Sequence, residues 1–91
     1  MNPERFLAEH CETTAETAEN RMCYWAECQR LYDIYCAWER LENRVTPGTK
    51  LEFFNAVKKF CPWTDVVQSL GAKWFRGIRF LGTFPRTRTL K

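Results

Sequence analysis

The most regular alternation of apolar and polar residues lies between residues 26 and 43. Apolar side chains recur there at steps of three and four residues, the spacing of one helix face, and charged side chains occupy the positions between them. The pattern predicts a helix over Ala26–Asn43. The expected inward positions are Cys28, Leu31, Ile34, Tyr35, Trp38 and Leu41, and the expected outward ones are Glu27, Arg30, Asp33, Glu39 and Arg40.

The N-terminus has the features of a helix start. Asn2 can cap a helix, Pro3 suits its first turn and Glu4 complements the helix dipole. A first helix should therefore extend to about Glu12. The stretch Thr13–Asn20 offers little to bury and is typical of a solvated helix end or a linker.

A third helix is predicted after the chain break at Pro47-Gly48. Thr49 and Glu52 have the spacing of a capping box, in which each side chain accepts a hydrogen bond from the other residue's backbone N–H. The helix should cover Lys50–Phe60. It should end at Cys61-Pro62, because the residue before a proline is disfavoured in helical geometry.

The remaining elements are expected to be extended. Asp65–Ser69 and Trp74–Phe80 predict a β-hairpin around Leu70–Lys73, whose glycine suits a turn with positive φ. Strict alternation along the second strand puts charged and apolar side chains on both faces, which an irregularity at Gly77 would resolve. A short strand, or the first turn of the long helix, is expected at Met22–Trp25.

The element order is thus helix, short strand, helix, helix and two strands. This is the order of an α+β winged helix, the helix-turn-helix variant in which three helices are followed by a C-terminal β-hairpin wing. Residues 1–84 are expected to form that single domain, and residues 85–91 a flexible basic tail.

Charge is distributed unevenly along the chain. Residues 1–45 carry nine acidic and five basic side chains, whereas residues 46–91 carry two acidic and nine basic ones. The basic half also interleaves cations with aromatic residues over Lys73–Phe80. A polyanion is the natural partner of such a surface, because each neutralised phosphate releases condensed counterions.

The candidate nucleic-acid-binding residues follow from this pattern, and we expect their cations to converge on one ridge of the last helix and the hairpin. Two of them, Lys58 and Lys59, are equally typical of a solvated helix face, and Trp74 is typical of a packing anchor as well as of a base-stacking residue. The full set is Lys50, Lys58, Lys59, Lys73, Trp74, Arg76, Arg79, Arg86 and Arg88.

Other chemistries find little support. The five cysteines are an odd number with no Cys-x-x-Cys pair, and His10 is the one histidine, so buried thiols are favoured over zinc or disulfides. No phosphate-binding glycine loop or catalytic triad pattern occurs, so we expect no enzyme activity and no cofactor. The chain has no apolar run long enough for a membrane span and no secretory signal, which favours an intracellular protein.

Short motifs resemble a known family. The series Leu31-Tyr32-x-x-Tyr35-x-x-Trp38, then Phe54, then Arg76-Gly77-Ile78-Arg79 resembles the RFX type of winged-helix DNA-binding domain. Together with the opening Phe6-Leu7-x-x-x-Cys11, it is also similar to the C-terminal domain of primase-helicase proteins of phages, mobile elements and poxvirus-type viruses.

The resemblance implies DNA binding by the third helix and the wing. By position, this falls on Lys58, Lys59, Lys73, Arg76 and Arg79. The sequence departs from the RFX pattern between residues 65 and 72, where it has no arginine and RFX domains are rich in them. Sequence-specific reading of the RFX type is therefore not implied.

The expected function is a non-catalytic DNA-binding module of a viral or mobile-element replication protein. Its expected partners are double-stranded DNA and the rest of such a protein, with no membrane and no small-molecule substrate. Two alternatives remain: a winged-helix adaptor that binds other proteins, and an RFX-like sequence-specific transcription regulator.

Overall fold

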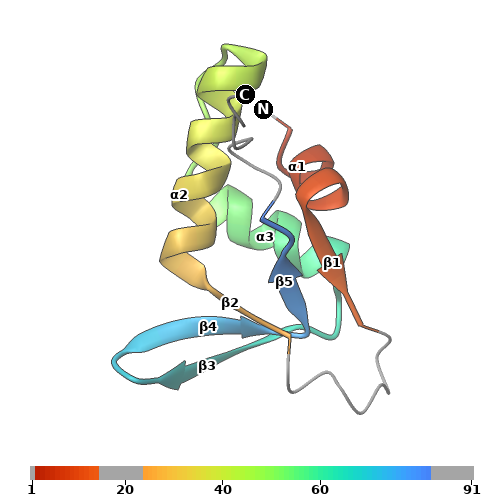
Figure 1. The fold of residues 1–91 in the computed structure, drawn as a ribbon, viewed down its shortest axis with the longest axis vertical. Helices are drawn as coiled ribbons and strands as arrows, with labels where there is room; N and C mark the ends of the chain where they lie inside the picture. Colours follow the sequence, from red (N-terminus) through yellow and green to blue (C-terminus); the bar gives the residue numbers. More distant parts are fainter. Residues whose placement is uncertain (1, 15–23, 83–91) are drawn as a thin grey trace, which may run out of the picture.

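The computed structural model describes residues 2–14 and 24–82, which form an α+β fold with three α-helices and two small antiparallel sheets. The helices gather at one end, and the β3–β4 hairpin lies across the other (Figure 1). The elements are α1 (Pro3–His10), β1 (Cys11–Thr13), β2 (Trp25–Glu27), α2 (Cys28–Trp38), the π-helical turn η2 (Glu39–Asn43), α3 (Lys50–Phe60), β3 (Asp65–Ser69), β4 (Ala72–Arg76) and β5 (Ile78–Phe80).

Helix α3 has the predicted bounds, because the capping box at its start and the proline after its end both act as expected. The Thr49 hydroxyl accepts a hydrogen bond from the Glu52 N–H at 3.2 Å, and the Glu52 carboxylate accepts one from the Thr49 N–H at 2.8 Å. The capping box is therefore confirmed. At the other end, Cys61 leaves helical geometry directly before Pro62, as predicted.

Helix α1 is shorter than predicted. It ends at His10, and the next three residues pair with β5 as strand β1, which the sequence pattern did not reveal. Asn2 precedes the helix, but its side chain makes no capping hydrogen bond. Its backbone N–H donates instead to the carboxylate of Glu39.

The predicted long helix forms from Cys28 through α2 and η2 to Asn43, whereas Ala26 and Glu27 belong to strand β2. Two of its positions were predicted wrongly: Glu39 was expected outside and is fully buried, whereas Leu41 was expected inside and is 66% exposed. Glu39 follows Leu31 and Tyr35 at steps of four residues, so the helical repeat places all three on the same inner face. It was expected outside because it is charged, and its burial depends on the hydrogen bonds that its carboxylate receives.

The strands form two sheets, with orders β1–β5 and β2–β4–β3. The predicted strand 74–80 is divided at Gly77, which has a φ of 98°. The Gly77 N–H donates to the Tyr24 carbonyl at 2.7 Å, and its carbonyl accepts from the Thr14 N–H at 3.2 Å. The expected irregularity is thus present, and it directs the chain from one sheet into the other.

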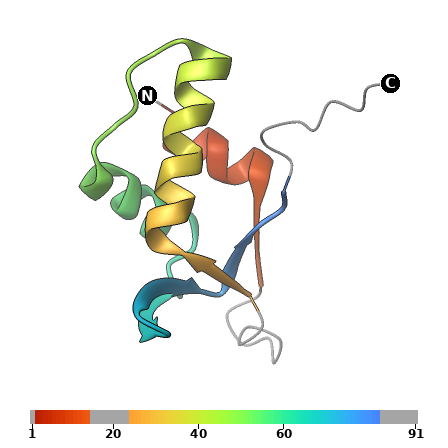
Figure 2. The ribbon, with the colours of Figure 1, turned by 60° about the vertical axis from the view of Figure 1, so that its left-hand side comes forward.

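The core consists of buried side chains contributed by the helices and the strands, whose arrangement is seen from a second side in Figure 2. Phe6 of α1 contacts the rings of Tyr35, Trp38 and Phe53, with centroid separations of 5.7, 5.5 and 6.2 Å. Phe75 of β4 packs edge-on against Phe54 of α3 at 5.1 Å. The Phe54–Phe75 contact packs the hairpin against α3.

Candidate nucleic-acid interface

Two of the expected cations, Arg76 and Arg79, have acidic partners. Arg76 lies opposite Asp65 in the β3–β4 register, and its Nε donates to Asp65 Oδ1 at 3.0 Å. This hydrogen bond raises the pKa of Arg76 above its ordinary value. The guanidinium therefore completes a cross-strand ion pair within the hairpin.

Arg79 forms an ion pair with Glu12, a residue of the acidic first half of the chain. It lies opposite Glu12 in the β1–β5 register and donates from Nε to Glu12 Oε1 at 2.6 Å. Its guanidinium also lies over the ring of Tyr24, 4.3 Å from the centroid. A phosphate would have to compete with both contacts.

The two adjacent lysines of α3 differ in their contacts. Lys58 Nζ donates to the carbonyl of Thr64 at 2.8 Å, where it helps to fix the connection to β3. Lys59 Nζ lies 3.4 Å from Glu4 in an ion pair whose side chains are 79% and 58% exposed. Such an exposed pair contributes about 0–1 kcal/mol, so Lys59 is only loosely held.

Lys50 and Lys73 approach the same point from different elements. Lys50, the first residue of α3, donates to the side chain of Gln29 and lies 5.8 Å from the centroid of the Phe54 ring. Burial raises the pKa of the Cys28 thiol to about 11, while the positive charges of Lys50 and Lys73 act in the opposite direction. Both lysines therefore lie within electrostatic range of the start of α2.

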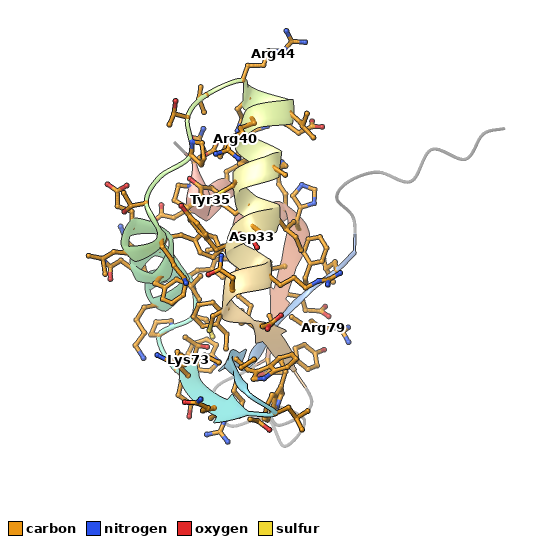
Figure 3. All side chains as sticks on the ribbon, turned by 90° about the vertical axis from the view of Figure 1, so that its left-hand side faces the viewer. Asp33, Tyr35, Arg40, Arg44, Lys73 and Arg79 are labelled. Carbon is orange, nitrogen blue, oxygen red and sulfur yellow. The ribbon has the colours of Figure 1, made fainter. Side chains whose placement is uncertain are left out.

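The predicted single basic ridge does not form among the described residues. Lys73 and Arg79 lie on opposite sides of α2, and Asp33 is on the exposed face of the helix between them (Figure 3). The glycine-centred break in the strand explains the separation, because it places Arg79 in a different sheet from Lys73. The cations of residues 50–79 are consequently divided between two sides of the molecule.

Three further arginines are exposed on the long helix or directly after it. Arg30 lies near the start of α2, Arg40 is the second residue of η2 and Arg44 directly follows η2. Figure 3 shows Arg40 and Arg44 at the end of the molecule far from the hairpin. None of the three forms an ion pair with another residue of the described ranges. The sequence pattern placed Arg30 and Arg40 outward but did not mark them as binding residues, because residues 1–45 are acidic on average.

Trp74 is half-buried, and the structure gives it a packing role. Its indole N–H donates to the Ser69 carbonyl at 3.0 Å, and its ring lies 5.9 Å from that of Trp25. Part of the ring still faces an open pocket. Arg86 and Arg88 lie outside the described residues, as does the predicted basic tail.

The buried carboxylate of Glu39 serves the fold. Burial raises its pKa, but hydrogen bonds from the Asn2 N–H, the Asn43 amide and the Tyr35 hydroxyl outweigh that effect and hold the pKa below its ordinary value. Tyr35 also accepts a hydrogen bond from the Gly48 N–H at 3.1 Å. The network therefore ties α1, η2 and the connection to α3 together.

Burial makes the thiols of Cys11 and Cys28 unreactive, because it raises the pKa of both. Cys11, Cys28, Cys36 and Cys61 are buried thiols, and burial raises the pKa of Cys11 to about 12. Thiols with such pKa values stay protonated at neutral pH and are poor nucleophiles and metal ligands. Over residues 2–14 and 24–82, the histidine, cysteine and acidic side chains form no group of three or more that could hold a metal ion.

Comparison with protein-family models, curated proteins and solved structures yields no match to this chain. In the described part of the chain, every helix is too short or too polar to cross a membrane.

Proposed function

We propose that this chain is a non-catalytic winged-helix module that binds double-stranded DNA. Following the resemblance to primase-helicase C-terminal domains, we place it in the replication machinery of a virus or mobile element. The DNA surface in this proposal is narrower than the one expected from the sequence.

The strand order β2–β4–β3 is the observation on which the proposal depends. The strand before α2 pairs with the second strand of the C-terminal hairpin, and α2 and α3 are consecutive between them. In a winged helix, this pairing carries the hairpin beside the third helix, so that both can contact one duplex. Phe54 and Phe75 form such a helix–hairpin contact here.

Phosphate contacts are assigned to Lys50, Lys58 and Lys73. All three are exposed and none is ion-paired within the described ranges. Lysine at such positions binds phosphate without reading sequence, which agrees with the absence of RFX-like arginines between residues 65 and 72. Arg76 and Lys59 take a secondary part, because each has an acidic partner, and Arg79 is left out because it lies on the other side of α2 from Lys73.

The test is a pair of triple variants with the same loss of charge. Lys50→Ala, Lys58→Ala and Lys73→Ala together should reduce affinity for a blunt duplex by about tenfold or more. The control combines Arg5→Ala, Arg40→Ala and Arg44→Ala, three arginines outside the assigned surface, and should retain affinity within about threefold. Equal losses in the two variants would refute the assigned surface, provided thermal unfolding shows both to be folded.

A protein-binding adaptor is the second candidate. It is favoured by exposed apolar side chains on α3 and the hairpin, where Leu51 is 70% and Leu70 is 94% exposed. An adaptor would show no measurable affinity for the blunt duplex even at low salt. A sequence-specific regulator would instead prefer one duplex over random competitors.

A further inference from the structure

An open pocket of about 320 Å³ lies between α2 and the strands, on a part of the molecule that the proposed duplex contacts do not use. This volume is at the lower end of the range for ligand sites, about 300–1,000 Å³, so it suits one small group and excludes a helix or a duplex. The pocket is lined by Trp25, Ala26, Glu27, Arg30, Leu31, Ile34, Trp74 and Phe80.

Aromatic rings form part of the walls, beside the aliphatic side chains of Leu31 and Ile34. Trp25 and Trp74 belong to the neighbouring strands β2 and β4, and their ring planes are inclined at 58°. The Trp74 N–H is already bonded to Ser69, so Trp74 presents ring surface rather than a donor to the pocket. Phe80 adds a third ring, and such surfaces favour a planar occupant held by stacking.

The rim carries one charge of each sign. Arg30 is exposed and has no ion-pair partner among residues 2–14 and 24–82, and Glu27 is half-buried at the end of β2. A guanidinium can bind a phosphate, and a carboxylate can accept hydrogen bonds from the amino or imino groups of a base. Stacking walls, a cation and an acceptor together match a single nucleotide.

We infer that this pocket holds one unpaired nucleobase, with Arg30 on the adjoining phosphate. The inference rests on the proposed function and deepens it: the module would bind a junction, with Lys50, Lys58 and Lys73 on the duplex and the pocket on the first unpaired nucleotide. A base within a duplex cannot enter, because both of its faces are already stacked. The favoured substrate is therefore a duplex with a single-stranded extension.

The experiment compares a blunt duplex with the same duplex bearing a short single-stranded extension, using the full chain. The extension should raise affinity about tenfold, the scale of one base stacked on an aromatic side chain. Arg30→Ala and Trp25→Leu should each remove most of that gain while leaving affinity for the blunt duplex unchanged. Arg40→Ala, an exposed arginine elsewhere on the same helical segment, is the matched control and should retain the gain.

A direct readout comes from 2-aminopurine at the first unpaired position, whose fluorescence should be quenched on binding and restored in the Trp25→Leu complex. Equal affinity for the two DNAs, or unchanged 2-aminopurine emission, would overturn the pocket's assignment and leave the proposed function standing. Absence of binding to either DNA would overturn both.

Discussion

At the scale of a single residue, Glu39 shows how a charged side chain can contribute to the stability of a fold. Its carboxylate is fully buried and receives hydrogen bonds at 2.8 Å from Tyr35 and from Asn43. A buried anion is tolerated only when such donors replace its lost hydration. Outward placement was the natural expectation, because glutamate is almost never fully buried without partners.

Glu39→Gln should lower the free energy of unfolding by about 2 kcal/mol at neutral pH. The NH2 group of the new amide would face groups that themselves donate hydrogen bonds to Glu39, so that some of these buried donors would be left without an acceptor. Glu42→Gln, at an exposed position of the same π turn, should change it by less than about 0.5 kcal/mol. Urea denaturation of the three proteins measures both values.

The effect of Glu39 should also depend on pH. Its pKa in the folded protein lies below the ordinary value of 4.5, so its ionised form stabilises the fold above that pH. The stabilisation is lost as the pH falls through the folded-state pKa. The stability gap between wild type and Glu39→Gln should therefore narrow in acid, and a gap that widened would contradict the network.

At the scale of elements, the hairpin turn combines a suitable residue with an unsuitable one. Leu70 and Gly71 both have positive φ, 55° and 77°, as a two-residue hairpin turn requires. Glycine adopts this region without cost, but leucine does not. Leu70 is also 94% exposed and gains almost nothing from burial.

Leu70→Asn should therefore stabilise the protein by about 1 kcal/mol, because asparagine tolerates left-handed geometry. Gly71→Ala should destabilise it by a similar amount. No atom lies within 4 Å of the added Cβ, so that loss would come from the backbone alone. Thermal unfolding of both variants tests the turn, and a destabilised Leu70→Asn would argue against it.

Helices whose ends are marked by neighbouring residues could be predicted from the sequence. Strands that form only by pairing with residues far along the chain could not. The capping box and Cys61-Pro62 define α3 within the sequence itself. Strand β1 exists because Cys11–Thr13 meet β5, some 67 residues away along the chain between Glu12 and Arg79. The hydrogen bond from the Asn2 N–H to the buried Glu39 carboxylate likewise joins residues 37 positions apart, which no local signal could indicate.

At the scale of the whole molecule, the basic residues that are concentrated in the second half of the sequence do not lie on one surface of the fold. The lysines of α3 and the hairpin could be named from the sequence. The sequence did not reveal which of the cations have acidic partners, because the ion pairs Lys59–Glu4 and Arg79–Glu12 join opposite halves of the chain. The three-dimensional arrangement therefore decides which cations can contact DNA.

Glu12→Gln removes the ion-pair partner of Arg79, which lies on the other side of α2 from Lys73. Affinity for duplex DNA should therefore stay within about twofold of that of Glu42→Gln, which removes the same charge without freeing a cation. Anisotropy titrations of both variants at one salt concentration make the comparison. A clearly higher affinity of Glu12→Gln would place Arg79 at the bound DNA and contradict the assigned surface.

The salt dependence of blunt-duplex binding tests the central claim most directly. Three lysine–phosphate contacts contribute about −2.7 to the slope of log K against log salt, since each contributes about −0.9. The slope of the variant lacking Lys50, Lys58 and Lys73 should be shallower than that of the wild type by about that amount. A wild type that binds duplex with the same slope as the variant would contradict the account.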